Sequence, residues 1–174
     1  MRKMPEIINW LKEQWGAPRE AIHRGQRCPF LLVCSFGARP TGAAALEEFP
    51  IGIPDDVREF WRTTQSAVLF KDEKYGQCGT QLLEPKQALI ETEKQITARP
   101  RDFANTDLVL GRFLGDSDLV VVACDPGSRN YGSIIIALPL DRRCDWPVAA
   151  RSFAKFLEKL VEAQGDKYWE VRQR

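Results

Sequence analysis

Three short apolar segments follow one another closely in the second half of the chain, and they constrain its fold more than any other feature. They are Leu108–Leu114, Leu119–Cys124 and Ser133–Leu138. Residues 115–118 link the first two segments, and residues 125–132 link the second two. Linkers of this length are typical of neighbouring antiparallel strands. The pattern therefore predicts an antiparallel meander, and Gly111 inside its first segment indicates a β-bulge.

Apolar residues at helical spacing predict four helices, over residues 4–15, 54–64, 85–97 and from about 145 to 164. Further strands are expected at residues 30–36, 67–71 and 80–83. We expect a loop over residues 37–52 with a helical turn at Ala43–Phe49, and a tail at Lys167–Val171 that forms a strand or covers the core. Because strands run together instead of alternating singly with helices, the prediction is an α+β fold with a mainly antiparallel sheet.

The charge balance excludes some classes of partner. The 174 residues contain 25 Lys and Arg against 24 Asp and Glu, a net charge of +1, which argues against a general nucleic-acid binder. The pairs Arg99/Arg101 and Arg142/Arg143 are too sparse to follow a phosphate backbone. Charged residues interrupt the N-terminal segment, and no apolar stretch approaches the roughly 18 residues of a membrane span. We expect a cytoplasmic protein with no membrane partner.

The cysteine and histidine counts restrict the chemistry further. Five scattered cysteines with no C-x-x-C spacing predict reduced thiols, and neither a zinc site nor another metal centre is expected. His23 is the single histidine and lies in a connection rich in Pro, Arg and Gly. A catalytic pair that requires histidine is therefore disfavoured. We expect no catalytic residues and no cofactor.

A hydrophobic residue and a proline lead into an expected helix that ends in an aromatic residue at Ile53–Trp61. The polar turn Lys71–Gln77, the central segment Leu108–Leu119, the strand Ile134–Leu138 and the helix at Ser152–Leu160 follow in that order. This order of segments resembles the SMI1/KNR4 family of the SUKH superfamily, whose members open in the same way. The likeness covers roughly residues 50–170 and depends on order and pattern, since no single motif is specific.

The resemblance implies a curved, mainly antiparallel sheet packed with helices, and a function through binding. It divides the chain into residues 1–49, an N-terminal helix and variable extension packed on the domain, and residues 50–174, the SMI1/KNR4-like domain, which together form one structural unit. Bacterial members are largely immunity proteins that neutralise toxins, so the implied partner is a cognate toxin. The sequence departs from the family at Thr64–Ser66, where many members carry an Asn-Gly or Asp-Gly style turn, and at Cys78.

Candidate partner-binding residues lie in loops and at the ends of elements. An exposed aromatic residue on a loop is the kind of anchor that interfaces use. The candidates are Asp72, Tyr75, Gln77, Asp116, Arg129, Tyr131, Trp146 and Trp169. The alternative is that the aspartates form turns, the loops are plain hairpins and the tryptophans pack in the core.

Two other functions remain open at this stage. A regulatory scaffold or small-ligand-binding module of the same fold would have a formed apolar pocket or several partners. A hydrolase that uses Asp116, Asp118 or His23 is disfavoured by the single histidine and by the turn setting of the carboxylates. It would require a carboxylate with a strongly perturbed pKa in a cleft.

Overall fold

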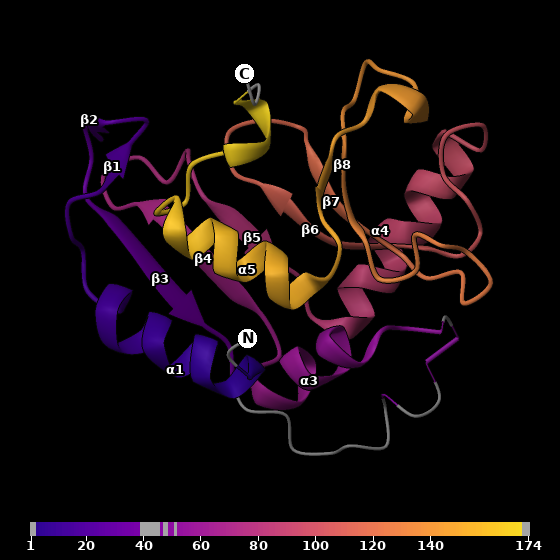
Figure 1. Cartoon of the computed structure of the whole chain (residues 1–174), viewed down its shortest axis with the longest axis horizontal. Coiled ribbons are helices and arrows are strands. Elements are labelled where there is room, and N and C mark those ends of the chain that lie inside the picture. The colour runs from indigo at the N-terminus through magenta and orange to yellow at the C-terminus, as the bar shows by residue number, and fades with distance from the viewer. Residues whose placement is uncertain (1–2, 39–45, 47–48, 51, 172–174) are drawn as a thin grey trace.

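Seven strands form one antiparallel sheet in which the strand order equals the chain order. The computed structural model describes residues 3–38, 46, 49, 50 and 52–171. The strands are β3 (Leu32–Phe36), β4 (Ala67–Asp72), β5 (Thr80–Leu82), β6 (Asp107–Phe113), β7 (Leu119–Ala123), β8 (Ile134–Ala137) and β9 (Val148–Ala150). A small second sheet pairs β1 (Ile22–His23) with β2 (Gln26–Arg27). The predicted α+β fold with a mainly antiparallel sheet is therefore confirmed (Figure 1).

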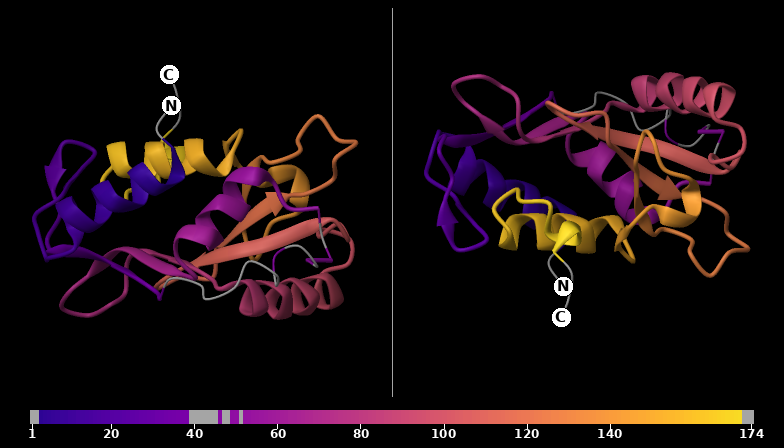
Figure 2. Two further views of the ribbon diagram at one scale, coloured as in Figure 1. Left: turned by 90° about the horizontal axis from the view of Figure 1, so that it is seen from below. Right: turned by 90° about the horizontal axis from the view of Figure 1, so that it is seen from above.

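Three helices cover one face of the sheet, which we call the inner face. They are α1 (Met4–Trp15), α3 (Asp55–Thr63) and α5 (Phe153–Glu162), and they contact one another in pairs (Figure 2). Their apolar stripes and alternate side chains of the strands bury the main core. Burial of each large apolar side chain in such a core contributes about 1.5–3 kcal/mol.

The helix α4 (Pro85–Ala98) lies against β6, on the opposite side from the other three helices (Figure 2). β5 is so short that the first half of β6 has no partner strand on that side. The buried hydroxyl of Thr92 takes its place, since it accepts the backbone N–H of Val109 at 2.8 Å and donates to the carbonyl of Ala88 at 2.6 Å. A side chain of α4 thus accepts a hydrogen bond from a backbone N–H group of β6 that has no partner in a neighbouring strand.

The second face of the sheet, which we call the outer face, carries a smaller buried cluster. Its members are Phe103, Val109, Leu119, Val121, Ala123, Ile135, Ala137 and Trp146. Only α4 and the segment around the short helix η1 (Arg143–Asp145) cover it among the described elements. The outer face is therefore where the sheet retains accessible surface.

A β-bulge at Gly111 decides which residues of β6 reach each face. The register shifts between Val109 and Gly111, so that Gly111 lies opposite Val120 and Arg112 lies opposite Leu119. A Cβ atom at Gly111 would lie 2.5 Å from the carbonyl oxygen of Gln81, which is too close for any side chain. The bulge predicted from the sequence is confirmed, and it places Arg112 on the outer face.

Two predictions were wrong, one about where the last helix begins and one about residues 22–27. The segment 145–150 does not begin a helix, because η1 and the strand β9 precede α5. Residues 22–27, predicted to be a plain connection, form the β1–β2 hairpin. The tail was predicted either to form a strand or to cover the core. It contains the short helix η2 (Tyr168–Glu170), which packs on the core. Most of the predicted turn at Ala43–Phe49 lies outside the described residues.

Candidate interaction surface

The structure divides the eight predicted contact residues between the two ends of the strands. The β4–β5 turn holds Asp72, Tyr75 and Gln77, and the β6–β7 turn at the same end holds Asp116. The β7–β8 connection at the other end holds Arg129 and Tyr131. Trp146 precedes β9 and Trp169 lies in η2.

Asp72 organises the β4–β5 turn from inside. Its carboxylate is buried and accepts the backbone N–H groups of residues 75, 76, 77 and 78 at 2.5–3.0 Å. Burial by itself would raise the pKa of Asp72, but the four donors outweigh it and lower the pKa to about 2. Asp72 therefore holds the loop in one shape, and its carboxylate has no exposed surface to offer a partner.

Tyr75 projects from this fixed loop. Its side chain is 57% exposed, its ring meets the edge of Phe30 at a centroid distance of 5.4 Å, and Lys74 Nζ lies 4.9 Å from the ring centre. A rigid, exposed tyrosine loses little conformational entropy when it is covered, which suits an interface anchor.

Gln77 and Asp116 are brought together, although they lie on different turns. They line a hollow of about 260 Å³ with His23 and Lys167. Lys167 Nζ lies 2.6 Å from Asp116 Oδ2 and 2.7 Å from Asp118 Oδ2. Burial would lower the pKa of Lys167, but the hydrogen bonds that its ammonium donates to both carboxylates raise the pKa overall. Both aspartates thus serve as partners of one lysine instead of standing free as general bases.

The two tryptophans contribute mainly to packing. Trp169 is half-buried and contacts the rings of Phe113 and Phe156. Trp146 is 5% exposed and lies between the guanidinium groups of Arg99 and Arg143, at 5.2 and 5.6 Å from its ring. Arg129 and Tyr131 are exposed on the β7–β8 connection. Of the predicted aromatic contacts, Tyr75 and Tyr131 offer the most accessible surface.

One groove of the outer face, which we call the β9 groove, has a volume of about 590 Å³. Its apolar lining comes from Ala104, Ala123, Ile135, Trp146 and Val148, and its polar lining from Thr106, Asp107, Asp125, Ser128, Asn130, Arg143 and Cys144. Arg143 donates to both carboxylate oxygens of the buried Asp107, at 2.5 and 3.0 Å. Asp107 also accepts the N–H of Ala104 at 2.7 Å, so its charge is fully compensated.

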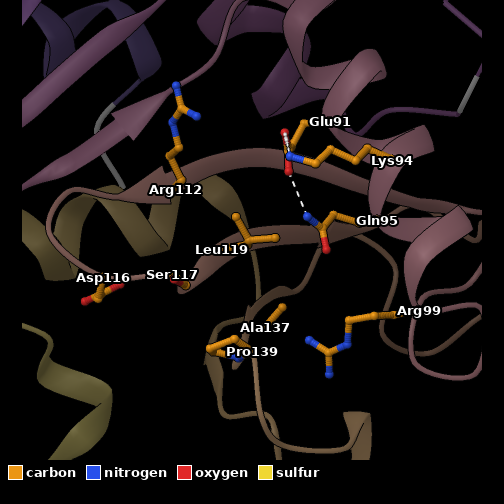
Figure 3. A pocket seen from close by; sticks show the side chains of 10 residues that line it. All are labelled: Glu91, Lys94, Gln95, Arg99, Arg112, Asp116, Ser117, Leu119, Ala137 and Pro139. Carbon is orange, nitrogen blue, oxygen red and sulfur yellow. Dashed lines mark hydrogen bonds and ion pairs between the residues drawn. The ribbon is translucent and has the colours of Figure 1, made fainter.

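A second groove, which we call the α4 groove, runs between α4 and strands β6–β8 and has a volume of about 280 Å³ (Figure 3). Leu119 and Ala137 provide apolar surface in it. The other lining residues are Glu91, Lys94, Gln95, Arg99, Arg112, Asp116, Ser117 and Pro139. A further hollow of about 290 Å³, beside Leu83, Gln87 and Ile90, shares Glu91 and Arg112 with it. The two hollows form a polar-rimmed channel along α4.

Of the residues that line this channel, only Asp116 was among the contact residues predicted from the sequence. A detectable signal was present, since Arg112 is the one charged residue inside the otherwise apolar run Leu108–Phe113. The contribution of α4 could not be predicted, because Glu91 and Lys94 line the same hollow as Arg112 only through the tertiary packing of α4 beside β6.

The described part of the chain holds no group of three or more His, Cys, Asp or Glu residues that could bind a metal ion. Burial raises the pKa of the Cys34 and Cys124 thiols to about 12, which leaves them protonated and unreactive near neutral pH. None of the helices that the structure describes has the length and apolar character needed to span a bilayer. Comparison of the chain with protein-family models, curated proteins and solved structures finds no match.

Proposed function

We propose that this chain is a non-enzymatic binding protein, and most concretely an immunity protein that neutralises a cognate toxin by covering it. The observation that carries the proposal is the partly covered outer face of the sheet. Its grooves combine apolar surface with a polar rim, which is the composition of a protein interface. The likeness of residues 50–170 to the SMI1/KNR4 family supports the toxin as the partner.

The mechanism we propose is occlusion. Strands β6–β8 pair along their lengths and fix the floor of the α4 groove, while Asp72 fixes the loop that presents Tyr75. A surface that is already ordered binds with little loss of conformational entropy. A standard interface covers about 800 Å² on each partner, enough to close the active site or substrate groove of a toxin domain.

A co-expression experiment tests this function. The chain is produced together with each candidate toxin domain found among the genes next to its own, and cell survival and complex formation are measured by plating and by size-exclusion chromatography with light scattering. We expect survival to be restored and a stoichiometric complex to form. Survival without a complex, or a complex without protection, would contradict neutralisation by occlusion.

A small-ligand-binding module is the second candidate, because the β9 groove has a suitable size. Ligand sites typically occupy about 300–1,000 Å³ and combine apolar walls with a few polar groups, and the groove of about 590 Å³ falls within that range. A thermal-shift screen against common metabolites tests it, with Asn130→Ala as the matched variant at the rim. A saturable rise in the Tm that the variant loses would favour this function. Retention of several unrelated partners by the tagged chain would instead favour a regulatory scaffold.

A further inference from the structure

Arg112 occupies a central position on the outer face. It belongs to a cross-strand row in which each residue lies directly opposite the next, from Val68 through Gln81, Arg112 and Leu119 to Ala137. Neighbouring strands are about 4.8 Å apart, so the row spans about 19 Å of the sheet. Arg112 is the only charged residue in that row.

No carboxylate in the described part of the chain serves as a counter-charge to Arg112. Its Nε donates to Gln81 Oε1 at 2.8 Å, and it makes no ion pair with any carboxylate among the residues that the structure describes. An exposed guanidinium without a carboxylate partner retains its terminal N–H donors for another molecule.

The other charged groups of the α4 groove are already engaged. Arg99 donates to Asp102 and to the carbonyls of Leu138 and Asp141, at 2.6–3.1 Å. Glu91 accepts from Gln95 at 2.8 Å and lies 3.8 Å from Lys94 Nζ.

The remaining carboxylate of the lining, Asp116, is paired with Lys167. With three cations and two carboxylates, the lining carries a net charge of +1, and the uncompensated group is Arg112.

We infer that the α4 groove binds an acidic segment of the partner protein, with one carboxylate of that segment held by the guanidinium of Arg112. The inference rests on the proposed function and names the chemistry of the partner. Arginine holds a carboxylate with two parallel hydrogen bonds, a geometry that lysine cannot reproduce. Leu119 and Ala137 supply apolar surface for the neighbouring residues of the segment. A nucleic acid is the poorer fit, because the single uncompensated cation of the groove cannot follow a phosphate backbone.

A binding experiment with the toxin domain that the co-expression experiment identifies tests the inference. Affinities are measured by calorimetry for the wild type, Arg112→Glu and Arg112→Lys. The matched control is Arg62→Glu, which makes the same charge change at an exposed residue of α3, in the helical layer of the inner face. We expect Arg112→Glu to weaken binding by about 100-fold, Arg112→Lys to weaken it less, and Arg62→Glu to leave it within about threefold.

A cross-linking measurement locates the contact independently. A photoreactive p-benzoyl-phenylalanine replaces Gln87, an exposed residue on the flank of the channel, and the toxin peptide it captures is identified by mass spectrometry. We expect a peptide that contains Asp or Glu.

The outcomes separate the two proposals. If the wild type binds the toxin but Arg112→Glu binds as well as Arg62→Glu does, the assignment of the α4 groove is overturned and the proposed function stands. If the wild type and the toxin form no complex, the proposed function is overturned and the groove inference falls with it.

Discussion

The two faces of the sheet share the same strands but are completed in different ways. Three helices close the inner face, and its core contains the largest buried side chains, among them Trp61, Phe60 and Phe153. The outer face has a smaller apolar cluster, and polar interactions such as Arg143–Asp107 and Arg99–Asp102 surround it.

This difference separates stability from recognition. Apolar burial is non-directional and scales with area, so the inner face supplies most of the folding free energy. Hydrogen-bonded charges add little net stability but fix side chains in defined positions. The outer face can therefore change its surface residues without loss of the fold, as a surface adapted to one partner requires.

The largest expected effect is that of a truncation on the inner face. Trp61 is 1% exposed, contacts Phe49 at a ring distance of 5.3 Å and donates its indole N–H to the carbonyl of Leu83 at 2.9 Å. Trp61→Ala should lower the free energy of unfolding by about 3–5 kcal/mol, measured by urea denaturation. The exposed Ile90→Ala on α4 should change it by less than about 0.5 kcal/mol. Equal losses for both variants would contradict the division between the faces.

A smaller effect is expected from the charged pair of the outer face. Arg143→Met leaves the buried carboxylate of Asp107 without its counter-charge, and should lower the free energy of unfolding by about 2–3 kcal/mol. The double variant with Asp107→Asn should recover part of that loss, giving a coupling of about 1–3 kcal/mol in a double-mutant cycle. Additive losses would show that the two side chains act independently.

The β4–β5 turn provides a pH-dependent test. Folding lowers the pKa of Asp72 from 3.8 to about 2, so its stabilisation is complete above pH about 4 and is lost as the pH falls through about 2. Asp72→Asn should lower the free energy of unfolding by about 2 kcal/mol at pH 7, and the difference from wild type should disappear near pH 2. Denaturation at several pH values measures this, with the exposed neighbour Glu73→Gln as control. A difference that stays constant with pH would rule out the carboxylate as the cause.

The smallest effect on stability is expected at Arg112. Because its guanidinium is exposed and, among the described residues, bonds only to Gln81, Arg112→Ala should change the free energy of unfolding by less than about 0.5 kcal/mol. The measurement also shows that the groove variants are folded. A decrease in the free energy of unfolding of more than about 1 kcal/mol would mean that Arg112 stabilises the sheet, and would contradict its assignment to partner binding.

Much of the fold could be predicted from local pattern. The meander followed from apolar runs joined by short linkers, and the bulge followed from Gly111. The β1–β2 hairpin could not be predicted, because two-residue strands contain no periodicity. β9 was missed because Val148–Ala150 follows Pro147, a residue also typical of the first turn of a helix.

The candidate surface could be predicted only in part, for a physical reason. Loop position identified Tyr75 and Tyr131 as exposed. It also selected Asp72, whose buried carboxylate accepts hydrogen bonds from the backbone of its own turn. Strand pairing decides which loops lie together, as it does for the loops of Gln77 and Asp116. The packing of α4 decides which of its residues line the α4 groove. Such contacts between distant segments leave no mark in local sequence.

The meander topology has a consequence for how the chain folds. Every strand of the large sheet pairs with its neighbours in sequence, and the β4–β5, β6–β7 and β7–β8 pairs form through short connections at residues 73–79, 114–118 and 124–133, whose closure loses little entropy. The helical layer is the opposite case, since α1 and α5 pack together from opposite ends of the described chain. We therefore expect the local strand pairs to form before the helical layer closes over them. The apolar inner face that is bare until then makes association between copies during refolding the particular hazard of this topology.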